Sequence, residues 1–187
     1  VQYIAKFHKE FANIDISVRN GLTHNLISDL KKGSLDVLIV NLPMENDEDL
    51  EITECAILHD GFAGNLEYKE KIKKPISLEE LVSNYPIVTQ KEPSNTRTFL
   101  NNLMSSNNVK FHPKFDIVSY GLVKEFAKIG LGIAYITKEF AQDELNNNQL
   151  FEIPIKETIP KRSLGIVLPK NMICSFATEK FIKIITN

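Results

Sequence analysis

A nearly continuous apolar run at residues 35–40 (LDVLIV) follows directly on a helix-length segment that ends at Gly33. Thr23 can cap that helix, and glycine can end it because it adopts the left-handed conformation without a steric cost. A run broken only by Asp36 is typical of a strand covered on both faces, as in a parallel sheet. Together with the alternating segment 14–18 (IDISV), it predicts a β-α-β unit and therefore an α/β fold.

The same alternation of strand-like and helix-like segments continues along the chain. A capping box at Ser77–Glu80 begins one helix, and Gly130 ends another. The polar, Pro-closed segment 69–75 is interpreted as a linker. We expect strands at 53–58, 61–66, 86–89, 115–118, 132–136, 150–155 and 164–168, and helices at 94–104, 122–129, 137–145 and 176–185.

Composition excludes several classes of protein. The 187 residues carry 22 Lys+Arg and 24 Asp+Glu, a net charge of -2, which is a poor electrostatic match for nucleic acid. No stretch of about 18 apolar residues is present, so no membrane span is expected. Cys55 and Cys174 are interpreted as small buried hydrophobic residues in a protein of the reducing cytoplasm. The four histidines show no metal-ligand spacing and no nucleophile–base motif appears, so no metal, no cofactor and no enzymatic activity is predicted.

The segment Ser94-Asn95-Thr96-Arg97 carries the richest chemistry. A helix that begins here offers backbone N–H groups and the positive end of its dipole, to which two hydroxyls and a guanidinium are added. That combination is typical of an anion site that needs no metal. The alternative is that Ser94 only caps the helix, a contribution of about 1 kcal/mol. The sequence leaves both interpretations open.

Thr23 and Asn41 lie just past two expected strands of the first region. Ligands of open α/β sheets bind beyond the carboxyl ends of strands, although each residue is equally compatible with an ordinary loop. Gly130-Leu131-Gly132 resembles half of a dinucleotide fingerprint, but it precedes a strand and lacks a third glycine. It is therefore interpreted as a helix stop followed by close packing.

Taken together, the pattern resembles the effector-binding domain of LysR-type transcriptional regulators. The matching segments are LKKGSLD at 30–36, ISLEEL at 76–81 with YPI at 85–87, and IGLGIA at 129–134. SNTR at 94–97 is similar to the Ser-Gly-Thr-Arg variant of one branch, with Asn95 in place of glycine. The order and spacing of these segments, which extend over nearly the whole chain, carry the resemblance.

The resemblance implies two α/β lobes of the periplasmic-binding-protein-like type 2 fold, joined by two crossings. Lobe one is expected at 1–66 plus 164–187 and lobe two at 67–163. It further implies that the family's winged helix-turn-helix, its linker helix and the first strand of lobe one lie outside this sequence. DNA would then be bound only through that N-terminal domain.

The implied function is to sense a small effector, a carboxylate or an inorganic oxyanion, in the interlobe cleft. Thr23 and Asn41 would contribute from lobe one, and Arg97 could balance the ligand's charge. The domains would pair as homodimers or larger oligomers through residues near 23–32 and 120–129. The alternatives are a secreted or lipid-anchored solute-binding protein of the same fold and, third, an enzyme on that fold. The expected contacts in lobe two are Ser94, Asn95, Thr96, Arg97, Ser119, Tyr120 and Gly121.

Overall fold

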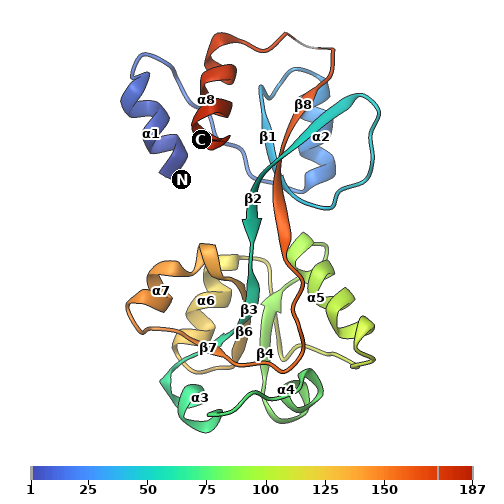
Figure 1. The fold of residues 1–187 in the computed structure, drawn as a ribbon, viewed down its shortest axis with the longest axis vertical. Helices are drawn as coiled ribbons and strands as arrows, with labels where there is room; N and C mark the ends of the chain where they lie inside the picture. Colours follow the sequence, from blue (N-terminus) through green and yellow to red (C-terminus); the bar gives the residue numbers. More distant parts are fainter. Residues whose placement is uncertain (1, 172, 187) are drawn as a thin grey trace. The chain divides into compact units, whose positions relative to one another are not determined.

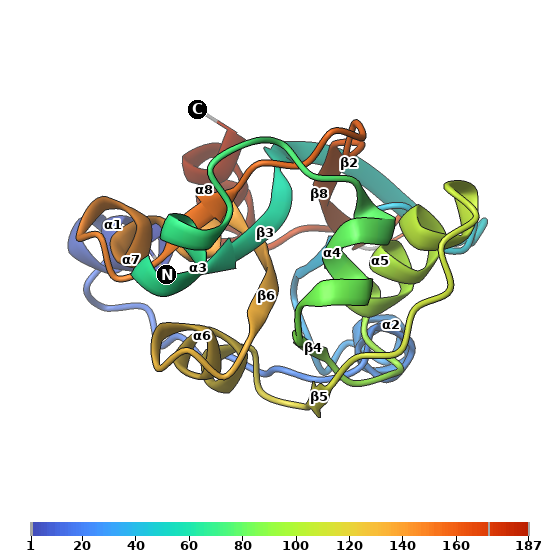
Figure 2. The same ribbon diagram turned by 90° about the horizontal axis from the view of Figure 1, so that it is seen from below.

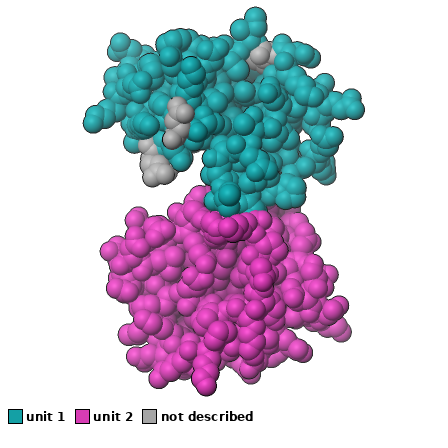
Figure 3. Space-filling model, viewed as in Figure 1, with its two compact units in different colours: residues 1–57, 162–187 teal, residues 58–161 magenta. Residues whose placement is uncertain are grey.

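The computed structural model describes residues 2–171 and 173–186 and divides the chain into two compact units (Figures 1 and 3). Unit 1 comprises Val1–Ile57 and Arg162–Asn187, and unit 2 comprises Leu58–Lys161. The sequence predicted the boundaries between the two lobes at 66/67 and 163/164, whereas the units divide at 57/58 and 161/162. The first boundary differs because β3 (Asp60–Gly64), expected in lobe one, pairs with two strands of unit 2.

Unit 2 is built on a five-stranded sheet of order β5-β4-β6-β3-β7. The central strand β6 (Ile133–Thr137) pairs parallel with β4 (Ile87–Gln90) and antiparallel with β3. β4 also pairs parallel with β5 (Phe115–Ile117), and β7 (Phe151–Ile153) forms the antiparallel edge beside β3. The carboxyl ends of β4, β5 and β6 therefore meet at one edge of the sheet.

Helices cover both faces of this sheet. α4 (Leu78–Asn84) and α5 (Asn95–Ser106) pack on one face, and α6 (Tyr120–Lys128) packs on the other (Figure 2). Successive residues of β6 alternate between the two cores, as a pleated strand requires. One core includes Leu78, Leu100, Ile133 and Tyr135, and the other includes Val123, Ala127, Ala134 and Ile136.

Several helix ends follow their sequence signals. The hydroxyl of Ser77 accepts from the N–H of Glu80, and the Glu80 carboxylate accepts from the N–H of Ser77, both at 3.1 Å. This confirms the predicted capping box. Gly33 and Gly130 end their helices with φ of 72° and 82°, where other residues would be strained. Thr23 differs, because it is the first residue of α2 (Thr23–Lys31) and its predicted role as cap is wrong.

Unit 1 holds a three-stranded sheet of order β1-β8-β2. β1 (Leu38–Asn41) pairs antiparallel with the central strand β8 (Arg162–Pro169), and β2 (Leu50–Leu58) lies on its other side. α1 (Gln2–Glu10) packs against α8 (Phe176–Thr186), with the rings of Phe7 and Phe181 5.3 Å apart. The core beside α2 contains Leu30, Leu38, Val40, Leu50 and Val167.

The predicted β-α-β unit of unit 1 is wrong. Residues 14–18 are not a strand, and β1 has an antiparallel partner instead of a parallel one. Alternation marks a chain that can be extended, but a strand also needs a partner, which residues 14–18 do not find among the described residues. β1 is also an edge strand, so Ile39 is 42% exposed and the run is not covered on both faces.

Two further segments differ from the expected helical structure. The predicted linker 69–75 begins inside α3 (Leu66–Lys71), whose Tyr68 is buried. The helix expected at 137–145 is a 3-10 turn, Lys138–Phe140, followed by α7 (Gln142–Asn146). Among the residues that the structure describes, no helix is long and apolar enough to cross a membrane.

Candidate functional site

The predicted site residues of unit 2 lie at the starts of α5 and α6. These helices follow β4 and β5, which are parallel neighbours, so the structure brings their starts to the same sheet edge. The backbone N–H of Lys91 donates to the carbonyl of Ile117 at 2.8 Å and links the two connecting loops. The carboxyl edge of parallel strands is where ligands of open α/β sheets bind. The residues brought together are Ser94, Asn95, Thr96, Arg97, Ser119, Tyr120 and Gly121.

At the start of α5, Ser94 is a helix cap. Its hydroxyl accepts from the N–H of Arg97 at 3.2 Å, and its carbonyl accepts from the N–H of Thr98 at 2.9 Å. The capping interpretation of Ser94 is therefore confirmed. Asn95 is exposed, whereas Thr96 is 7% exposed. The buried Thr96 side chain therefore lies in the first turn of α5, next to the backbone N–H groups of the helix N-terminus.

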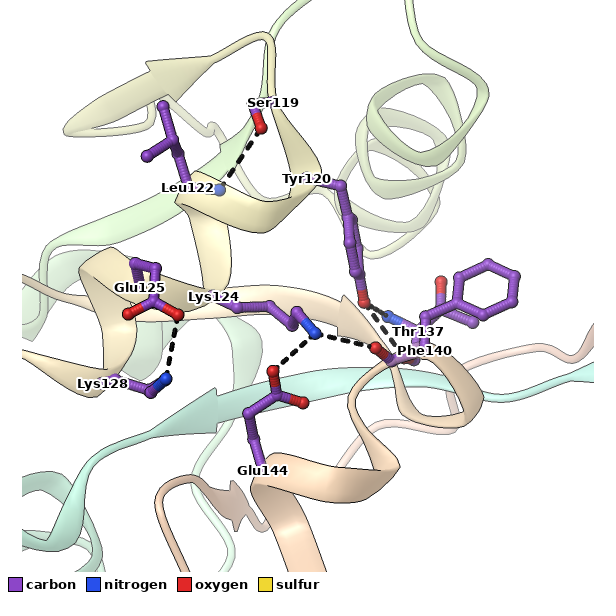
Figure 4. Close-up of polar contacts among 9 residues, drawn as sticks. All are labelled: Ser119, Tyr120, Leu122, Lys124, Glu125, Lys128, Thr137, Phe140 and Glu144. Atoms are coloured by element: carbon purple, nitrogen blue, oxygen red, sulfur yellow. Dashed lines mark hydrogen bonds and ion pairs between the residues drawn. The ribbon is translucent and has the colours of Figure 1, made fainter. Parts of the chain in front are cut away.

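The start of α6 is fixed to the end of β6 (Figure 4). The Ser119 hydroxyl accepts from the N–H of Leu122 at 3.5 Å. The Tyr120 hydroxyl accepts from the N–H of Thr137 and donates to its carbonyl, both at 3.1 Å. Thr137 in turn donates its hydroxyl to the buried carboxylate of Asp60 at 2.7 Å. Gly121 is exposed beside these contacts.

Arg97 is buried, with 8% of its surface exposed. Its Nη1 donates to Asp116 Oδ1 at 2.8 Å and to the carbonyl of Gln90 at 3.4 Å, and its Nε donates to Asn101 Oδ1 at 2.8 Å. The guanidinium also lies 5.1 Å from the ring centre of Phe111. The positive charge of Arg97, which was expected to balance the charge of a ligand, is therefore already paired with Asp116 inside unit 2.

Thr89 is a buried polar residue that the sequence did not single out. It lies next to the end of β4, is 0% exposed, and its hydroxyl has no hydrogen-bond partner among the described residues. A buried hydroxyl in this state destabilises the folded protein.

The remaining predicted site residues belong to unit 1. Thr23 is half-buried at the first turn of α2, and Asn41 ends β1. The Oδ1 of Asn41 accepts from Nη1 of Arg162 at 2.7 Å. Arg162 is only 6% exposed, and sequence reasoning missed it because it stands in a polar segment. Only the register that pairs Asn41 with Leu164 reveals that it lies beside Asn41.

An ion pair fixes the middle of α6. Lys124 Nζ lies 2.6 Å from Glu144 Oε1 and donates to the carbonyl of Phe140 at 3.0 Å (Figure 4). Burial is the largest single influence and would by itself raise the pKa of Glu144. The hydrogen bond from Lys124, a backbone hydrogen bond and the charges of Lys124 and Lys128 together outweigh burial and leave the pKa below its usual value.

A cavity of about 220 Å³ in unit 2 is lined by none of the predicted site residues. Three of its charged groups are paired, since Lys138 pairs with Glu152 and both Glu157 oxygens accept from the N–H of Leu78 at 3.0 Å. Within the described residues, no group of three or more His, Cys, Asp or Glu side chains could hold a metal ion. The cavity is lined by His59, Asp60, Gly61, Phe62, Lys138, Glu152, Ile153, Ile155, Glu157, Ile159 and Lys161.

Comparison with known proteins finds one family over the whole chain. Residues 1–187 match the model described as LysR substrate binding domain. A curated relative, the HTH-type transcriptional regulator CysL of Bacillus subtilis, is 23% identical over 164 residues, which are 88% of this chain and 54% of that protein. The chain thus spans about half the length of the curated relatives that it matches.

Solved structures show the same fold. The regulatory domain of CcmR from Synechocystis PCC6803, in complex with 2-PG, superposes with a TM-score of 0.85 at 18% identity, covering 99% of this chain and 88% of that one. The effector-binding domain of QuiR, in complex with shikimate, gives 0.79 at 19% identity, with coverages of 99% and 87%. The expected periplasmic-binding-protein-like type 2 fold is therefore confirmed.

Proposed function

Because this chain belongs to the LysR substrate-binding domain family, we propose that it is the effector-sensing domain of a transcriptional regulator. Relatives named as HTH-type regulators support this proposal over a secreted solute-binding protein. The chain itself would catalyse no reaction. DNA would be bound by a winged helix-turn-helix outside this sequence, and the protein would act in the cytoplasm.

The proposed ligand is a small anion, either a carboxylate or an inorganic oxyanion. The observation that carries this proposal is the meeting of two helix starts, those of α5 and α6, at one edge of a parallel sheet. Backbone N–H groups and the dipoles of both helices favour negative charge there. Thr96 and Ser119 would add hydroxyl donors to this edge of unit 2.

Ligand binding would act by shifting a population. A ligand changes the regulator only to the extent that it prefers one conformation, and a tenfold preference corresponds to about 1.4 kcal/mol. The neighbours solved in complex with 2-PG and with shikimate support a small effector, and both compounds carry a carboxylate.

Calorimetric titration with sulfate, 2-phosphoglycolate and shikimate tests the proposal. We expect the chain to bind at least one of these probes, and Thr96→Val to weaken that binding about tenfold or more because a hydrogen bond to a charged ligand is lost. Thr98→Val is the matched control, since Thr98 is exposed in the same helix. Equal affinities of the wild type and Thr96→Val would remove Thr96 from the site.

A further inference from the structure

The contacts of Arg97 connect four separate segments of unit 2. Nη1 reaches Asp116 on β5 and the carbonyl of Gln90 at the end of β4, while Nε reaches Asn101 one turn further along α5. The same Nε lies 3.9 Å from a carboxylate oxygen of Glu92, in the loop between β4 and α5. Asn101 also donates to Glu92 at 2.6 Å, which closes the network.

The carboxylates of this network already balance the positive charge of Arg97, so little of that charge is left to attract an anionic ligand. Arg97 faces two carboxylates, Asp116 and Glu92, whose side chains are 42% and 60% exposed, whereas its own side chain is 9% exposed. An anion bound to this guanidinium would have to displace Asp116 from a 2.8 Å ion pair or lie beside it as a like charge.

The network also involves the segments that lead into the two helix starts. Asp116 is three residues before Ser119, and the N–H of Lys91 donates to the carbonyl of Ile117. The side chain of Gln90 reaches the carbonyl of Val118 at 3.5 Å. The end of β4 is thereby held to the segment that leads into α6, so a change at Arg97 can reach both helix starts.

We propose that Arg97 is a positioning residue: it holds the starts of α5 and α6 in place for a ligand, and it does not itself contact that ligand. This inference rests on the proposed function for its effect on binding. The contacts of Arg97 with Gln90, Glu92, Asn101 and Asp116, called here the Arg97 clamp, are formed by the protein alone. The anion would then be recognised by neutral N–H and O–H donors.

The Asp116→Asn variant separates positioning from direct contact by the sign of its effect. If Arg97 positions the helices, Asp116→Asn weakens binding of sulfate or 2-phosphoglycolate about tenfold, as Arg97→Gln does, and the double variant is no weaker than the worse single one. If Arg97 contacts the anion, removing the competing carboxylate strengthens binding, which would overturn the proposal. Arg97→Lys, which keeps the charge but not the planar fork, should restore only part of the affinity.

Hydrogen exchange of the protein without ligand provides a readout that does not depend on the proposed function. We expect Arg97→Gln and Asp116→Asn to speed exchange at the Leu122 and Val123 amides about tenfold, because the first turn of α6 loosens. Glu144→Gln, which removes an ion pair further along α6, should leave these two amides unchanged. Unchanged exchange in both clamp variants overturns the proposal, even if no probe binds to the wild type.

Discussion

Single side chains of unit 2 show where the folded protein gains and loses stability. Thr89 is fully buried, and its hydroxyl finds no partner among the described residues. We expect Thr89→Val to stabilise the protein by about 1 kcal/mol, because an apolar methyl replaces an unsatisfied hydroxyl of the same size. Urea unfolding measures the change, and Thr98→Val, at an exposed position, is the control. A destabilised Thr89→Val protein would mean that the hydroxyl bonds a buried water.

The ion pair of Lys124 and Glu144 predicts a dependence of stability on pH. The folded pKa of Glu144 lies below its ordinary value of 4.5, so its contribution is present above that pH and disappears as pH falls through the folded pKa. The difference in unfolding free energy between wild type and Glu144→Gln should therefore shrink below about pH 4.5. Glu48→Gln removes an exposed carboxylate and should show no such trend. A constant difference down to pH 3 would contradict the assignment.

Glycines decide how closely the elements of unit 2 approach one another. A Cβ added to Gly132 would lie 2.5 Å from the carbonyl oxygen of Pro86, at the point where β6 begins. We expect Gly132→Ala to cost at least about 2 kcal/mol, because backbone must move. A Cβ at Gly121 meets only the Ser119 hydroxyl at 3.7 Å, so Gly121→Ala in the first turn of α6 should cost nothing or stabilise the helix. Thermal unfolding of both variants compares the two glycines, and equal losses would contradict this packing.

Elements with a local signal could be predicted from the sequence, and those that depend on distant partners could not. The capping box at Ser77 and the stop at Gly130 were found because their physics lies within a few residues. Ser94 was predicted to begin a helix from its own capping signal, whereas Ser119 was named only through the resemblance to the family. The assignment of β3 to unit 2 depends on its pairing with a distant strand, β6. Residues 14–18 likewise form no strand because no other strand pairs with them among the described residues. Local sequence patterns do not reveal such distant partners. Arg162 was missed for the same reason.

At the scale of the whole molecule, we expect self-association through α6. Apolar side chains are exposed on and around this helix, with Val118 80%, Leu122 50% and Ile129 68% exposed. LysR-type regulators act as oligomers, and a second copy of this domain is the partner that we expect there. Leu122→Glu with Ile129→Glu should shift sedimentation toward the monomer, while Ile57→Glu, on β2, should not. A wild-type domain that stays monomeric at high concentration would contradict this expectation.

The order of strands has a consequence for synthesis. β8, the central strand of unit 1, is made after all of unit 2, because residues 58–161 lie between β2 and β8 in the chain. As the polypeptide leaves the ribosome, unit 2 is complete and free to fold while β1 and β2 still wait for the strand that joins them. Nascent unit 1 is therefore the part of this protein that we expect chaperones to shield longest.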